Sequence, residues 1–165
     1  MSEFIRAMGV DPGLANTGYA VVEVSDKKGI ARVWDTVSTD PKEPLSNRLH
    51  TIFAYFQTIL QKWAVDILVL EGIYVLPKYP NAALQLGAVR GVVSLAAAIQ
   101  KVEVKELKPT EVKMALTGNG RARKDQVERA VRKIFMFKDK IKPDHASDAL
   151  ALALVGLSRY GMIQW

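Results

Sequence analysis

The sequence predicts an α/β fold in which a mixed five-stranded sheet is flanked by helices. Three short apolar runs near the start of the chain are separated by turns, which is typical of an antiparallel meander. Beyond them, apolar residues with helical spacing alternate with two further strand-like runs. The resulting order of three strands, helix, strand, helix, strand and three helices indicates a sheet covered by helices.

The first three strands are expected at residues 4–10, 17–24 and 31–37. The turn DPG at 11–13 separates the first two, and a charged turn that ends at Gly29 separates the second from the third. Proline and glycine at such points interrupt regular structure, so each run should end where its turn begins.

A helix, a buried strand and a second helix follow. From Leu45 to Trp63, apolar residues recur at every third or fourth position, which predicts a helix with a wide buried stripe. Residues 66–70 are a short continuous apolar run, as expected of a central strand. The next helix should run from a cap at Asn81 to about Gln100. One face of it carries Leu84, Ala88, Val92, Leu95 and Ile99.

The remaining elements are a strand and three helices. The strand is expected at 102–107, and a short helix should follow Pro109. After a glycine-rich loop at 117–121 come a helix at about 124–136 and a final helix, for which Asp144 is the expected N-cap.

Composition limits the possible classes. The 165 residues suit one domain, and the absence of cysteine excludes disulfides and thiolate zinc sites. We find no secretory signal and no run of roughly 18 uninterrupted apolar residues, as a membrane span would need. The net charge of +6 points towards a nucleic-acid partner without establishing one.

Three carboxylates stand where the ends of elements would bring them together. Asp11 ends the first strand, Glu71 ends the central strand, and Asp148 lies in the last helix with His145 three residues before it on the same face. Clustered carboxylates repel one another unless a cation lies between them, and Mg²⁺ prefers oxygen ligands. Two such ions can promote hydrolysis of a phosphodiester, so a basic protein with this cluster is predicted to be a nuclease.

Each residue also has a structural interpretation. Asp11 belongs to a common turn sequence, a glutamate after a strand is unremarkable, and Asp144 can simply start a helix. The combination is more specific than its members, because a helix start does not account for Asp148 one turn further in.

Five segments resemble the RuvC family of Holliday junction resolvases, in order and spacing, over nearly the whole chain. They are GVDPGLANTGYA (9–20), LVLEG (68–72), LQLGAVRGVV (84–93), EVKMALTGNGRARKDQV (111–127) and HASDALALA (145–153). The resemblance implies a ribonuclease H-like fold in a single nuclease domain, residues 1–165 with a core of about 4–158. It also implies a homodimer that makes symmetric paired nicks in a four-way DNA junction, in recombination and repair, and leaves 5′-phosphate and 3′-hydroxyl ends.

By the same resemblance, each active site would hold two Mg²⁺ ions, with Mn²⁺ as a substitute. Asp11, Glu71, His145 and Asp148 would be the metal ligands, and Asp144 is a weaker alternative to His145. The enzyme would act in the bacterial cytoplasm at the nucleoid, without a membrane, and could work with a branch-migration motor.

The resemblance also implies DNA contacts. Lys113 and Lys124 match positions near the scissile phosphate, and Lys124 would also stabilise charge in the transition state. Tyr74 matches an aromatic that stacks on an unpaired base, and packing against the helix at 81–100 is a close alternative. Arg121 and Arg123 would add phosphate contacts, or else belong to a solvated loop. Arg90 is left as a packing residue or weak DNA contact.

Three other functions compete with this hypothesis. Another ribonuclease H-like nuclease, YqgF-type or RNA-directed, would share the acidic cluster. A sugar-kinase or actin-like ATPase would need a second similar domain, for which 165 residues leave no room. A non-catalytic junction-binding protein is disfavoured by the intact carboxylates.

Overall fold

A computed structural model describes residues 4–72 and 80–165, which form ten elements in the predicted order. The strands are β1 (Arg6–Asp11), β2 (Asn16–Ser25), β3 (Lys28–Ser38), β4 (Ile67–Glu71) and β5 (Glu103–Leu107). The helices are α1 (Leu45–Trp63), α2 (Pro80–Ile99), α3 (Pro109–Thr117), α4 (Lys124–Ile134) and α5 (Asp144–Arg159).

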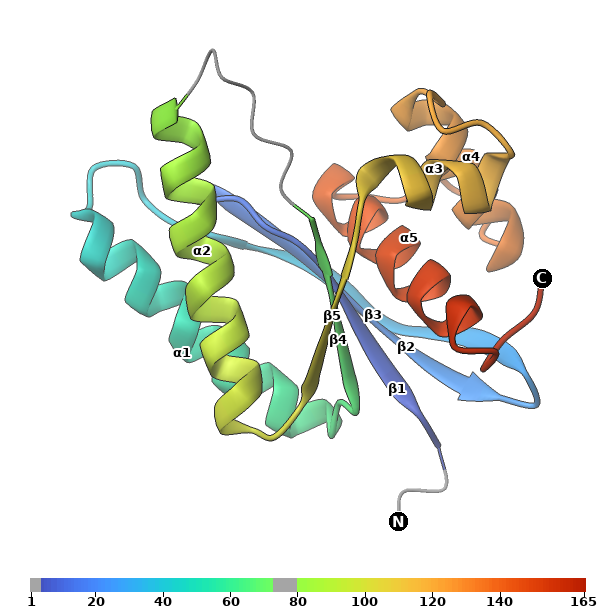
Figure 1. Cartoon of the computed structure of the whole chain (residues 1–165), viewed down its shortest axis with the longest axis horizontal. Helices are drawn as coiled ribbons and strands as arrows, with labels where there is room; N and C mark the ends of the chain where they lie inside the picture. The colour runs from blue at the N-terminus through green and yellow to red at the C-terminus, as the bar shows by residue number, and fades with distance from the viewer. Residues whose placement is uncertain (1–3, 73–79) are drawn as a thin grey trace.

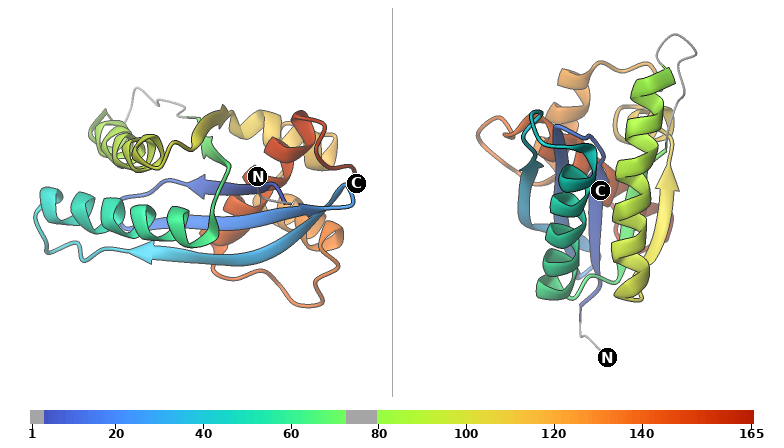
Figure 2. Two further views of the ribbon diagram at one scale, coloured as in Figure 1. Left: turned by 90° about the horizontal axis from the view of Figure 1, so that it is seen from below. Right: turned by 90° about the vertical axis from the view of Figure 1, so that its left-hand side faces the viewer.

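The strands form one mixed sheet with the order β3-β2-β1-β4-β5. The first three strands are the predicted antiparallel meander, and β4 and β5 run parallel to β1. Helices α1 and α2 cover one face of the sheet, whereas α3, α4 and α5 lie on the other (Figures 1 and 2). The predicted α/β fold with a mixed five-stranded sheet is therefore confirmed.

Alternation along the strands decides which residues face α5. Met8 and Val10 are buried against α1 and α2, whereas Ala7 belongs to the core beneath α5. Because successive strand residues point to opposite faces, Asp11 is directed to the same face as Ala7. In β4, Ile67 and Val69 belong to the core beneath α5, so Glu71, two residues after Val69, is directed to that face as well. The sheet thus presents both carboxylates to the side on which α5 lies.

Two glycines allow α5 to lie directly on the sheet. A Cβ at Gly9 would be 1.9 Å from the carbonyl oxygen of Ala149, and a Cβ at Gly18 would be 2.2 Å from that of His145. No side chain fits at such distances, so any substitution would push the helix away. Gly18 also pairs with Asp11 across β1 and β2. This close approach brings the first turn of α5 to the end of β1.

Some element boundaries differ from the prediction. β1 begins at Arg6 and α4 ends at Ile134, so each is shorter by two residues at one end. β3 begins at Lys28, three residues earlier than expected, because β2 and β3 are joined by a two-residue turn. Its residues, Asp26 and Lys27, both have positive φ, which matches the twist of the two strands. Lys28 and Gly29, which were expected in the turn, therefore belong to β3.

The start of α2 was also predicted wrongly. The helix begins at Pro80, so Asn81 lies inside it and does not cap it. Proline suits the first position of a helix because its missing N–H has no partner there in any case.

The apolar residues of α2 are divided between two sides of the helix. Val89, Val93, Ala96 and Ala97 are buried against the sheet and α1. Three residues of the face expected from the sequence point outward: Leu84 is 73% exposed, and Leu95 and Ile99 are each 53% exposed. Val92, by contrast, is partly buried against the core. Among the described residues, α2 is long and apolar enough to cross a membrane. Length and composition alone are weak evidence for a membrane span, because a helix in the core of a folded domain can have both. One packed side and one exposed apolar side account for that composition.

Candidate active site

The first turn of α5 lies against the end of β1. Nδ1 of His145 is 2.7 Å from Oδ2 of Asp11, and one ligand atom from each of Asp11, His145 and Asp148 lies within 4.8 Å of the others. The Asp11 side chain is only 13% exposed, whereas that of His145 is 45% exposed. Burial, more than any other effect, raises the pKa of Asp11 above its usual value. Two residues one helical turn apart therefore face a largely buried carboxylate.

Asp144 does not have the role expected of it. The N-cap of α5 is Pro143, without a side-chain hydrogen bond, and Asp144 is the first helical residue. Its exposed carboxylate lies outside the three-residue group, in the first turn, where a negative charge is favourable. The prediction of an Asp144 cap was wrong because proline preceding it supplies the extended backbone that starts the helix.

Glu71 is the third carboxylate of the site. Burial, then the charges of Asp11 and Asp148, then a side-chain hydrogen bond with Asp11 raise the pKa of Glu71 to about 7. Lys113 opposes this effect. A carboxylate that is hard to ionise without a cation is typical of a site that takes one up.

Two lysines face these acids from α3 and α4. Nζ of Lys124 is 2.8 Å from Oδ2 of Asp148. Burial alone would lower the pKa of Lys124, but the hydrogen bond and charge of Asp148 raise it above its usual value. Lys113, Lys124, Glu71 and Asp148 line an open cavity of about 220 Å³. Positive and negative groups thus share one depression large enough for a phosphate.

The other residues proposed to contact DNA are placed differently. Arg121 is exposed in the loop between α3 and α4. Arg123 is also exposed, but its guanidinium pairs with Asp125 at 3.0 Å, which offsets part of its charge. Tyr74 lies outside the described residues.

The acidic group fits a hard divalent cation. Carboxylate oxygens are the ligands that Mg²⁺ prefers, and a neutral imidazole can complete such a set. The raised pKa values of Asp11 and Glu71 show that these charges are costly without positive charge between them. The residues therefore constitute a metal-capable site.

The sequence alone did not reveal why these residues meet. Glycines inside strands were the available signal, because such positions often mark the close approach of another backbone. Gly9 and Gly18 occupy those positions, and they bring α5 within reach of Asp11.

Comparison with known proteins shows which family the chain belongs to. Residues 7–156 match the family model described as crossover junction endodeoxyribonuclease RuvC. The chain belongs to the RuvC family. A curated member from Carboxydothermus hydrogenoformans is 38% identical over 159 residues, which cover 95% of this chain and 98% of that protein.

Solved structures of the family share the fold. The structure of Thermus thermophilus RuvC matches with a TM-score of 0.86 and 32% identity, covering 96% of this chain and 98% of that one. T. thermophilus RuvC in complex with a Holliday junction substrate matches with a TM-score of 0.88 at the same identity, covering 96% and 97%. The fold is therefore ribonuclease H-like, as the resemblance implied.

Proposed function

We propose that this chain resolves four-way DNA junctions in recombination and repair, by hydrolysing one phosphodiester bond in each of two opposed strands. The observation that carries the proposal is the meeting of Asp11, His145 and Asp148 within 4.8 Å, in a chain of the RuvC family. The products would carry 5′-phosphate and 3′-hydroxyl ends, which a ligase can seal.

Asp11, Glu71, His145 and Asp148 would hold two Mg²⁺ ions, for which Mn²⁺ can substitute. Bound there, the ions supply the positive charge that activates water and stabilises the leaving oxygen. The contact between His145 and Asp11 keeps the imidazole directed at the site. The burial of Asp11 limits competition from bulk water.

Lys124 and Lys113 would hold the DNA backbone next to the acids. Lys124 pairs with Asp148, but its side chain is 54% exposed and can turn towards an incoming phosphate. Its charge would then stabilise the negative charge that develops in the transition state. Arg121, Arg123 and Tyr74 would extend the contact with the junction, and the net charge of +6 favours that binding.

Two copies of the chain would pair through the exposed face of α2. A homodimer is needed because two opposed strands of the junction must be cut, one by each active site. Leu84, Ala88, Gly91 and Leu95 recur at alternating intervals of four and three residues, the spacing of a helix-pairing seam. A Cβ at Gly91 would touch nothing within 4 Å among the described residues, so a second helix could approach closely there. Ala96 and Ala97, by contrast, pack inside the protein.

Leu95→Glu should weaken the dimer by placing a charge in this seam, and the paired cuts should become single nicks. Sedimentation and a supercoiled plasmid carrying a junction-forming repeat would measure both effects. Met136→Glu is the matched control, because Met136 is 87% exposed and follows α4 on the other face of the sheet. A variant at Leu95 that stays dimeric would contradict the assignment of this face.

We also propose that residues 4–158 form the core of a single nuclease domain. The enzyme would act in the bacterial cytoplasm at the nucleoid, where a branch-migration motor would deliver junctions; curated relatives such as those from Carboxydothermus hydrogenoformans and Caldanaerobacter subterraneus support a bacterial setting. No membrane is required for this role.

The function can be tested with a labelled four-way junction and with a linear DNA duplex, a DNA–RNA hybrid and an RNA of matched sequence, each with Mg²⁺ or with chelator. We expect paired nicks in the junction only, and only with metal. Equal cutting of duplex, hybrid or RNA would point to another nuclease of this fold. A folded dimer that binds junctions but cuts nothing with any divalent ion would be a binding module.

A further inference from the structure

Arg90 lies in the middle of α2 and reaches across to the ends of two strands. Its Nη1 donates a hydrogen bond to the carbonyl oxygen of Glu71, and its Nη2 is 2.7 Å from Oε1 of Glu106. The side chain is only 12% exposed. An arginine that is this buried needs acceptors for its donors, and the two strand ends supply them.

Arg90 contacts the carbonyl of Glu71 at the point where β4 is no longer paired with β1. The pairing of β1 with β4 reaches Leu70, and Glu71 pairs only with Leu107 of β5. The N–H of Gly72 donates to the Leu107 carbonyl at 2.8 Å, which holds the other side of the strand end. Arg90 therefore secures the main chain of Glu71 from the opposite face of the sheet to its carboxylate.

We propose that Arg90 is a positioning residue of the active site: by holding the Glu71 carbonyl and Glu106 together, it fixes the end of β4 and directs the Glu71 carboxylate at the metals. This role rests on the proposed function, because it requires Glu71 to be a ligand. Arginine suits the task because its planar fork can serve two acceptors in fixed directions, which a lysine ammonium does less well.

Replacing Arg90 should weaken both metal binding and cleavage. Hydrogen-bonding partners behind metal ligands typically contribute about 10- to 100-fold in metal affinity or activity. Arg90→Gln should therefore weaken metal binding and slow cleavage by about that factor. Junction binding should stay within about twofold, because Arg90 contacts the strand ends and not the DNA. Arg90→Lys should recover part of the loss.

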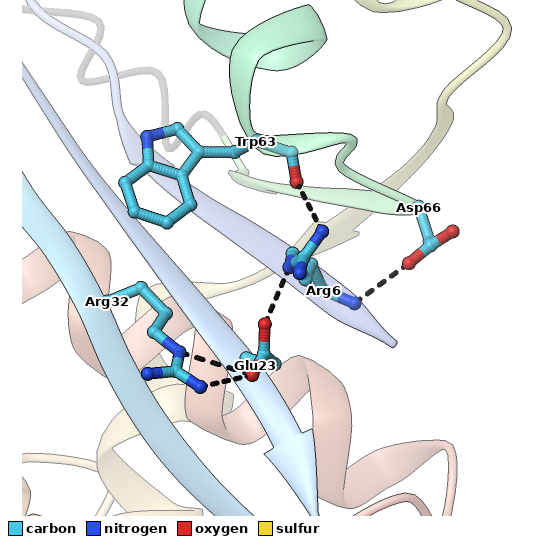
Figure 3. Close-up of polar contacts among 5 residues, drawn as sticks. All are labelled: Arg6, Glu23, Arg32, Trp63 and Asp66. Carbon is cyan, nitrogen blue, oxygen red and sulfur yellow. Dashed lines mark hydrogen bonds and ion pairs between the residues drawn. The ribbon is translucent and has the colours of Figure 1, made fainter. Parts of the chain in front are cut away.

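Arg6 provides a matched control within the same sheet. Like Arg90, it joins a backbone carbonyl and a glutamate: it donates to the Trp63 carbonyl at 3.2 Å and pairs with Glu23 at 2.7 Å (Figure 3). Arg6 begins β1, whereas the metal-capable residue Asp11 ends it. Arg6→Gln should therefore lower thermal stability without changing metal affinity.

The experiment uses the full chain with Arg90→Gln, Arg90→Lys, Arg6→Gln and Glu71→Gln. Mn²⁺ binding without DNA would be measured by electron paramagnetic resonance. Single-turnover cleavage would be measured at saturating junction and Mg²⁺, junction affinity in Ca²⁺, and the melting temperature in chelator. We expect only the Arg90 and Glu71 variants to lose Mn²⁺ affinity.

Different failures have different meanings. Full cleavage by Glu71→Gln would overturn the assignment of the site itself. Loss of activity in Glu71→Gln with wild-type Mn²⁺ binding in Arg90→Gln would overturn only the positioning role. Weakened junction affinity with unchanged Mn²⁺ binding would make Arg90 a DNA contact instead. Parallel losses in the Arg90 and Arg6 variants would make it merely structural.

Discussion

Asp11→Asn should reduce junction cleavage by on the order of 10³-fold or more, because several kcal/mol of transition-state stabilisation depend on the metals and each 1.4 kcal/mol is a factor of ten. Asparagine keeps the size of the side chain but removes the charge next to His145 and Asp148. The phosphate contacts are assigned to lysines and arginines and not to Asp11, so junction affinity in Ca²⁺ or chelator should change little.

The measurement is single-turnover cleavage of a labelled junction, with affinity determined separately by gel shift. Asp144→Asn is the matched control, because it removes the same charge from an exposed residue next to the site and should leave the rate unchanged. His145→Asp should keep metal-dependent cleavage, because it exchanges one ligand for another, whereas His145→Ala should lose most of it. Wild-type cleavage by Asp11→Asn would remove the basis for metal-assisted hydrolysis here.

The fold could be predicted from the sequence to the extent that local pattern decides it. Alternation and turn residues indicated the β1–β3 meander, and continuous apolar runs indicated β4 and β5. Local pattern could not predict whether the apolar face of α2 that carries Leu84 and Leu95 packs against the sheet or faces outward. Leu84 and Leu95 look like core residues in a periodic pattern, yet smaller residues, such as Ala96, fill the space against the sheet. Periodicity identifies a face but cannot tell core from interface.

The site was predictable in composition but less so in arrangement. Residue type, spacing and family resemblance singled out the acids, and Asp11, His145 and Asp148 do meet. The supporting contacts depend on side chains from distant elements, which no local pattern encodes. Arg90 is the clearest case, because its partners on β4 and β5 are 19 and 16 residues away in opposite directions along the chain.

Glu71→Gln should make the metal-free protein more stable at pH 8 while abolishing cleavage. The folded protein raises the pKa of Glu71 from 4.5 to about 7, so folding favours the protonated carboxyl. The protonated Glu71 carboxyl therefore makes its full contribution to the free energy of unfolding below pH 4.5, and this contribution is lost as the pH rises through 7. At pH 8 the ionised carboxylate then costs on the order of 3 kcal/mol relative to a neutral side chain.

Denaturant unfolding in chelator at pH 5 and pH 8 would measure this difference. Glu71→Gln should exceed the wild type in stability at pH 8 and approach it at pH 5, whereas the exposed Glu43→Gln should differ at neither. Divalent ions should stabilise the wild type more at pH 8 than at pH 5, because they compensate the cost of burying the ionised Glu71 carboxylate next to Asp11 and Asp148. A wild type whose metal-free stability does not fall between pH 5 and pH 8 would contradict the argument. The acidic cluster is thus expected to lower the stability of the empty fold, and metal binding should restore it.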